Sequence, residues 1–171
     1  MAQSHQNRIH ATVSAFQSAS EGMIAALEGL NDAAATHAPA GGGWHAAQIG
    51  YHVAVTNDFL AGILTGATAG ARQAPHGFEE NPNVFSGLPS KIETFPSLVP
   101  PPGVTRAQAL ERLRESTALA VRAIEGLTAE RAAGEVVDFS FGVISLYQLA
   151  EFLGGHVVRH QAQLQRVTAS V

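Results

Sequence analysis

Histidine is the residue type through which this sequence can do chemistry. The chain carries eight histidines against ten lysines and arginines, and two of them, His156 and His160, are four residues apart. On a helix, residues four apart lie on one face with their Cβ atoms about 5–6 Å apart. Two imidazoles so placed can bind one metal ion, each through a nitrogen about 2.0–2.1 Å away. By itself such a pair is more often incidental, so a third ligand is needed to favour a metal site.

His52 provides that third imidazole. It occupies a seam position in an apolar pattern of helical spacing, where a buried imidazole without a partner costs about 1–3 kcal/mol. A metal ion shared by His52, His156 and His160 would satisfy all three, and three histidines leave a coordination position open, as catalytic sites do. Because Val157 follows His156, the H-E-x-x-H motif of zinc proteases is absent.

Four helices are expected to position these side chains. Apolar residues recur with steps of three and four over residues 9–30, 49–63, 110–124 and 146–167. Capping boxes at Thr105 with Gln108 and at Ser145 with Gln148 mark where the last two helices begin. With no competing strand pattern, the sequence predicts an all-α protein, a four-helix bundle forming one domain over residues 1–171.

Two segments lie outside the helical pattern. Residues 67–104 contain seven of the eight prolines, so we expect an irregular crossover and not a long helix. Its apolar content predicts that it packs as a lid over the open end of the bundle near His52. Residues 135–144 alternate as a strand does, but no partner strand is evident, so we expect an extended connection into the last helix.

Three further residues are candidates for a pocket beside the metal. Gln163 lies one turn beyond His160 on the same seam, where it could hydrogen-bond a ligand of the metal or be a satisfied core amide. Arg159 is either an anion contact at the pocket mouth or a solvated surface residue. Trp44, the only tryptophan, more simply anchors the chain where it enters the second helix.

Composition excludes several classes of function. The absence of cysteine rules out disulfides, thiolate metal sites and a cysteine nucleophile. A net charge of −4 and the lack of a basic stripe argue against a nucleic-acid partner. No apolar run reaches the roughly 20 residues of a membrane span, and the polar N-terminal residues lack a signal-peptide core. We therefore expect a cytoplasmic protein.

Two segments carry a resemblance to a known family. Residues 44–52 (WHAAQIGYH) and residues 152–164 (FLGGHVVRHQAQL) are similar to the two signature segments of the DinB-like superfamily. The resemblance implies an up-down-down-up bundle with a long crossover between the second and third helices, and a metal site on His52, His156 and His160. Family members often cap the second helix with Ser or Thr after the Trp, so His45 at that position predicts a weaker cap.

The resemblance also suggests an activity. Characterised relatives include transferases and isomerases that use a low-molecular-weight thiol, so we expect a metal-dependent thiol transferase acting on a small molecule. Three imidazoles suit zinc, nickel, iron or copper, and the sequence does not select among them. A hydrolase using metal-bound water, and a non-catalytic bundle that binds metal or a small ligand under stress, remain alternatives. A homodimer is also expected.

Overall fold

The computed structural model describes residues 2–86, 88 and 94–169, and these are mostly helical. Four long helices, three short helical segments and three short strands make up the fold, in the order α1 (Ala2–Glu28), α2 (Asp32–Ala35), α3 (Ala46–Thr65), β1 (Ala71–Gln73), η1 (Pro96–Leu98), α4 (Arg106–Glu125), α5 (Ala129–Gly134), β2 (Glu135–Phe139), β3 (Gly142–Ser145) and α6 (Leu146–Thr168). The prediction of a mainly helical chain is confirmed.

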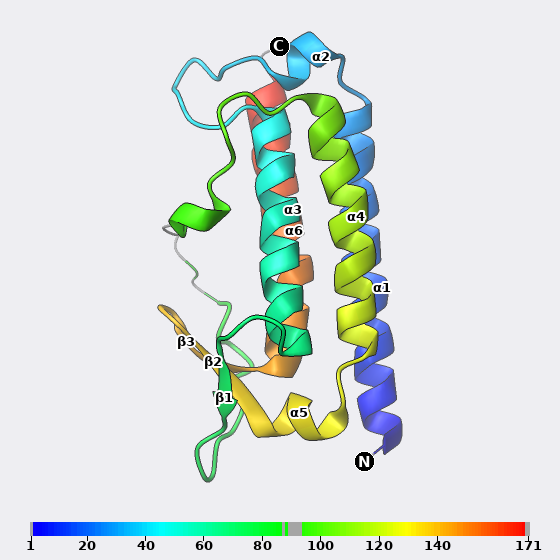
Figure 1. Cartoon of the computed structure of the whole chain (residues 1–171), viewed down its shortest axis with the longest axis vertical. Coiled ribbons are helices and arrows are strands. Elements are labelled where there is room, and N and C mark those ends of the chain that lie inside the picture. The colour runs from blue at the N-terminus through cyan, green and yellow to red at the C-terminus, as the bar shows by residue number, and fades with distance from the viewer. Residues whose placement is uncertain (1, 87, 89–93, 170–171) are drawn as a thin grey trace.

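The four long helices lie side by side, with α1 and α6 running in one direction and α3 and α4 in the other (Figure 1). Each of them packs extensively against two neighbours, α3 against α4 and α6, and α1 against α4 and α6. Their inward faces bury large apolar side chains, among them Phe16, Met23, Leu27, Ile49, Leu113, Ile124, Leu149 and Leu153. The helical seams of the sequence therefore form the core, which fixes how α3 and α6 face each other.

Capping boxes fix where the helices begin. Thr105 with Gln108 and Ser145 with Gln148 form the two boxes that the sequence predicts. A third box stands at the start of α3, where the Nδ1 atom of His45 accepts from the backbone N–H of Gln48 at 3.3 Å. The cap expected to be weak is thus complete, because Nδ1 lies as many bonds from the backbone as the oxygen of Asn or Asp, which are preferred caps.

A small antiparallel sheet corrects the prediction for residues 135–144. These residues form β2 and β3, joined by a two-residue turn, with Phe139 opposite Gly142. The other edge of β2 pairs with β1, which lies inside the segment expected to be irregular. The expectation of an unpaired extended connection is wrong, because the partner strand is only three residues long and shows no alternation that could reveal it.

The described parts of the crossover lie along the side of the molecule formed by α3 and α6. The backbone oxygen of Asn81 accepts from Gln148 Nε2 at 2.8 Å, and that of Pro101 accepts from Gln48 Nε2 at 3.2 Å. Glu80 forms an ion pair with Arg8 of α1 at 2.9 Å. These contacts reach from the start of α6 to the start of α3, so the described part of the segment packs along the sides of these helices. That the segment forms a lid stays a prediction.

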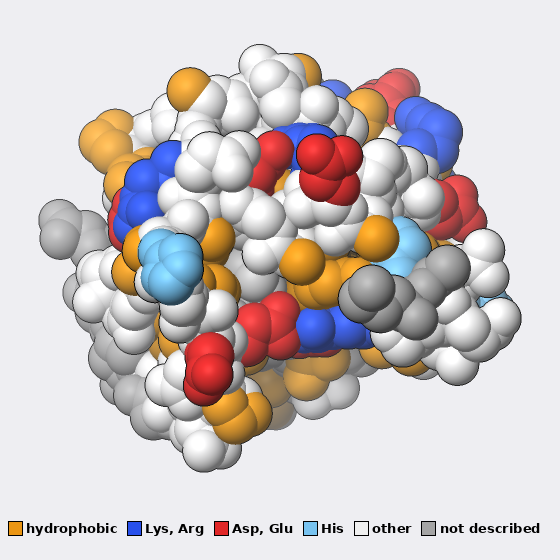
Figure 2. Space-filling view, turned by 90° about the horizontal axis from the view of Figure 1, so that it is seen from below, with side chains coloured by type: hydrophobic (Ala, Val, Ile, Leu, Met, Phe, Trp, Pro, Cys, Tyr) orange, Lys and Arg blue, Asp and Glu red, His pale blue; other side chains and the backbone are white. Residues whose placement is uncertain are grey.

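In the described part of the chain, no helix is both long and apolar enough to span a membrane. On the face seen from below in Figure 2, acidic and basic side chains are interspersed with apolar and uncharged ones. The described residues of that face present no continuous basic stripe of the kind that nucleic-acid-binding proteins use.

Candidate metal centre

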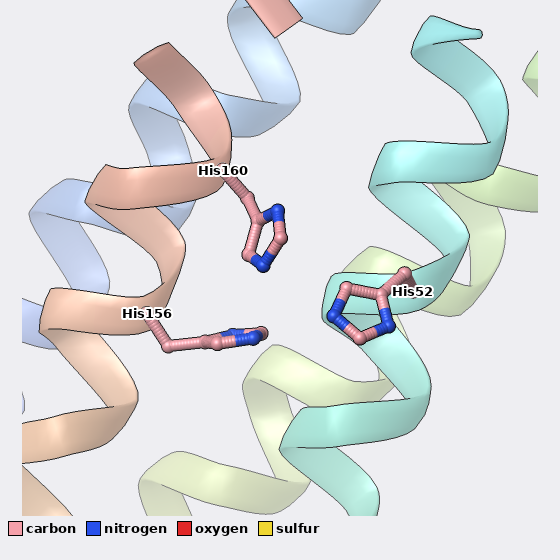
Figure 3. Close-up of side chains that lie close together, drawn as sticks. All are labelled: His52, His156 and His160. Atoms are coloured by element: carbon pink, nitrogen blue, oxygen red, sulfur yellow. The ribbon is translucent and has the colours of Figure 1, made fainter. Parts of the chain in front are cut away.

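His52 of α3 and His156 and His160 of α6 point into one shared space between the two helices (Figure 3). Each offers a nitrogen, and the three nitrogens lie within 4.8 Å of one another. The ring centroids are 4.4 Å apart for the pair on α6, and His52 lies 4.7 Å from His160 and 5.3 Å from His156. Among the described residues this is the one cluster with the spacing of a metal site, and it contains no carboxylate.

Burial keeps these imidazoles neutral. The side chain of His52 is 4% exposed, and burial lowers its pKa despite a hydrogen bond that raises it. Burial lowers the pKa of His160 to about 4, with the charge of His52 acting in the same direction. Burial, followed by the charges of His160 and His52, holds the pKa of His156 well below its ordinary value. Neutral imidazoles have the free lone pair that metal binding requires.

The outer nitrogens of two of the rings are held by hydrogen bonds. His52 Nδ1 lies 2.9 Å from the backbone oxygen of Leu98, and His160 Nδ1 lies 2.8 Å from Gln163 Oε1. A carbonyl oxygen can only accept, so each Nδ1 carries the hydrogen and each Nε2 keeps its lone pair. This arrangement, in which a second group fixes the tautomer and orientation of a ligating histidine, is typical of metal sites.

His156 tests whether the cluster fits a metal ion. Its Nδ1 atom is buried and has no hydrogen-bond partner among the described residues. A buried polar atom without a partner costs about 1–3 kcal/mol, so a ring placed like this needs a compensating interaction. A metal ion bound through Nε2 would compensate for the burial of the ring and would leave Nδ1 with a hydrogen to donate, and three nitrogens within 4.8 Å of one another fit the group that the sequence predicts.

Comparison with known proteins agrees with this geometry. The family model of the DinB superfamily matches residues 15–164, which include α3, α4, most of α6 and all three histidines. The chain belongs to the DinB superfamily. No curated protein and no solved structure matches it. Membership in the DinB superfamily does not identify a substrate or a metal, so both have to be inferred from the site itself.

The pocket residues expected for this DinB-superfamily chain lie around the cluster in different ways. The ring of Trp44, two residues before α3, packs against that of His52, with centroids 4.7 Å apart. The positive charge of Arg159 lies near enough to lower the pKa of both histidines on α6. Gln163 directs its oxygen at His160 Nδ1 and so holds that ring in place.

An aromatic group beside His156 is not predicted by the sequence reasoning. Phe152 lies 5.9 Å from the ring of His156, and Phe85, Phe139 and Phe141 lie within 5.6–5.9 Å of Phe152. All four phenylalanines are half-buried. They come from the crossover, the hairpin and α6, so only the alternation of Phe139 and Phe141 could have hinted at a shared face. The group gives the site an apolar wall next to one ligand.

The remaining histidines do not join the cluster. His5 Nδ1 lies 2.6 Å from the hydroxyl of Tyr147, and His45 caps α3. His10, His37 and His76 are exposed. The three clustered histidines are therefore separate from the other five, although His5 has a partner and is less exposed than expected.

Proposed function

We propose that this DinB-superfamily chain binds one divalent metal ion through His52, His156 and His160. The observation that carries the proposal is the convergence of three neutral imidazoles, one buried and two half-buried, whose nitrogens lie within 4.8 Å of one another. In this proposal the four long helices are the up-down-down-up bundle expected of the superfamily, with residues 67–104 as its long crossover. Zinc, nickel and iron are the metals considered, since imidazole suits each of them.

The ligand set determines what kind of molecule the site would accept. Three neutral imidazoles add no negative charge, so a divalent ion held by them keeps its full charge and favours an anionic ligand. Three protein ligands also leave a coordination position for that ligand. A divalent ion at such a position lowers the pKa of a bound thiol or water and so supplies a nucleophile at neutral pH.

A small-molecule thiol is the ligand we propose, which makes the protein a metal-dependent thiol transferase. Because the chain has no cysteine, any thiolate must arrive on a cofactor or substrate. The half-buried phenylalanines beside His156 offer an apolar surface to the group that receives the thiol, and the charge of Arg159 favours an anion nearby. These features support the proposal by charge and by surface chemistry.

In the described structure, the hydrolase alternative has no available carboxylate base on α6 near the ligands. Glu151 is the acidic residue of α6 nearest in sequence to the ligands, and it is exposed. Its carboxylate forms an ion pair with Arg8 at 2.7 Å, on the outside of the bundle. A water-activating carboxylate therefore has no candidate in this part of α6, and the thiol transferase is preferred.

Two measurements test the proposal. Metal content of the purified, reloaded protein is measured first, and we expect one divalent ion per chain, with His37→Ala as a control outside the cluster. The metal-loaded protein is then screened with low-molecular-weight thiols and electrophilic acceptors, and thiol consumption is followed. A full metal content in the His156→Ala, His160→Ala double variant would contradict the metal site. Metal-loaded protein that turns over no thiol and has no exchangeable metal ligand would contradict the transferase.

A further inference from the structure

One ligand of the proposed metal site lacks the support that the other two have. His52 and His160 each present their Nδ1 atom to an oxygen, at 2.9 Å and 2.8 Å. His156 Nδ1 is buried without a partner among the described residues. A ligating imidazole almost always donates its other ring N–H to an oxygen. The question is which oxygen of this chain serves His156.

Thr56 offers a buried oxygen that is also without a partner. Its side chain is 5% exposed, and its Oγ1 atom has no hydrogen-bond partner among the described residues. A helical threonine commonly donates to the carbonyl four residues earlier. Thr12 does so toward Arg8 at 2.8 Å, and Thr168 toward Leu164 at 3.0 Å. The hydroxyl of Thr56 is instead left available within the core.

The direction of the helices places Thr56 on the side of the site where His156 lies. Thr56 is four residues after His52, so the two share a face of α3. The helices α3 and α6 pack against each other and run in opposite directions (Figure 1). A step from His52 to Thr56 therefore runs in the same direction as a step along α6 from His160 to His156, so Thr56 lies on the His156 side of His52.

Three other buried side-chain oxygens have no hydrogen-bond partner among the described residues: Asn57 Oδ1, Ser20 Oγ and Thr117 Oγ1, the last of which belongs to α4. Asn57 Oδ1 belongs to a side chain whose amide nitrogen lies 3.5 Å from Ser116 Oγ, on α4. Ser20 Oγ belongs to α1. Among the described residues, the unpaired buried oxygen on the same face of α3 as His52 is Thr56 Oγ1.

We propose that Thr56 Oγ1 accepts the Nδ1–H of His156 when the site holds its metal ion. The hydroxyl oxygen has two lone pairs with which to accept this hydrogen bond. Thr56 is thus a positioning residue that fixes the His156 tautomer with its lone pair on Nε2. This inference rests on the proposed metal site and adds a third oxygen to those of Leu98 and Gln163.

The test compares Thr56→Val with Thr56→Ser by competition for metal with a chromophoric chelator. Valine keeps the shape and removes the oxygen, and we expect the affinity for zinc to fall about tenfold or more. Serine keeps the oxygen, and we expect an affinity within about threefold of the parent, well short of the loss from removing a second-shell partner. Thr117→Val is the matched control, since Thr117 Oγ1 is also buried without a partner but lies on α4.

Thermal unfolding with and without metal separates positioning from a loss of structure. Without metal, Thr56→Val should unfold no earlier than the parent, because the substitution removes an unpaired buried hydroxyl. A tenfold loss of affinity should lower the stabilisation by saturating zinc by about 1.4 kcal/mol.

Each result bears on a different claim. The role of Thr56 would be overturned if Thr56→Val lost less than about tenfold in affinity for zinc. It would also be overturned if Thr117→Val or Thr56→Ser lost as much affinity as Thr56→Val. Parent protein that binds no metal would overturn the metal site itself, and the inference with it. If the parent protein binds zinc and the variants do not behave as expected, the role of Thr56 fails while the metal site stands.

Discussion

Acid should destabilise the metal-free protein through its buried histidines, and this can be measured apart from any catalysis. Burial lowers the pKa of His160 to about 4, and burial also lowers the pKa values of His52 and His156. In the unfolded chain a histidine has a pKa of about 6.5. Between those values the unfolded chain binds protons that the folded protein does not, so the free energy of unfolding falls as the pH falls.

The size of the effect follows from the shift at His160. One pKa unit corresponds to about 1.4 kcal/mol. Acidification from about pH 6.5 to about pH 5 should therefore cost about 2 kcal/mol through His160 alone, before its ring is protonated in the folded state. His52 and His156 act in the same direction. Because a domain of this size is stable by only about 5–15 kcal/mol, the loss is a large share of the total.

Urea unfolding followed by far-UV circular dichroism, with a chelator present, measures this dependence from about pH 7 to about pH 5. Ordinary carboxylates titrate mostly below that window, so the slope reports on histidine. His160→Gln should be less sensitive to pH than the parent, and His37→Gln, at an exposed position, should match it. A stability that is constant over the window, or an unchanged slope in His160→Gln, would refute the reasoning.

Three further predictions address the site and its support. The double variant His156→Ala, His160→Ala should lose its bound metal, as measured by elemental analysis after gel filtration; retention of one ion per chain would contradict the ligand assignment. Gln163→Leu removes the acceptor 2.8 Å from His160 Nδ1, and should weaken zinc binding about tenfold in a chelator competition, whereas an unchanged affinity would show that this hydrogen bond does not matter. Glu80→Ala removes a carboxylate that pairs with a guanidinium and accepts from the hydroxyl that caps α6, and should lower the free energy of unfolding by about 1–2 kcal/mol. The exposed Glu79→Ala should change it by less than about 0.5 kcal/mol, and equal losses would show that the contacts of Glu80 contribute nothing.

Local periodicity explains why the cluster could be predicted. The spacing of four between His156 and His160 is a property of one helix, and the seam position of His52 is a property of another. Capping boxes at Thr105 and Ser145 are local as well, and the structure places helix starts where they stand. Once the two helices pack by their apolar faces, the three rings have to meet, so the cluster needs no long-range information beyond the seams.

Contacts made by the backbone, or between distant segments, could not be predicted in this way. The oxygen bonded to His52 Nδ1 is the main-chain carbonyl of Leu98. Every residue has such a carbonyl, so no residue type in the sequence indicates this contact. The strand β1 is three residues long, and only its partner 64 residues later makes it a strand. The contact between His160 and Gln163 could be predicted from the sequence, because residues three apart on a helix are neighbours.

The crossover takes part in the proposed metal site through its backbone. Because the Leu98 carbonyl can only accept, its bond to His52 Nδ1 fixes the hydrogen there and leaves Nε2 as the atom able to bind metal. Metal binding at Nε2 makes the Nδ1–H a stronger donor and so strengthens the same bond. By thermodynamic reciprocity, whatever packs η1 more firmly against α3 must raise the affinity of the site by the same factor. The packing of η1 on α3 and the affinity of the proposed site for metal are thus coupled through the Leu98 carbonyl.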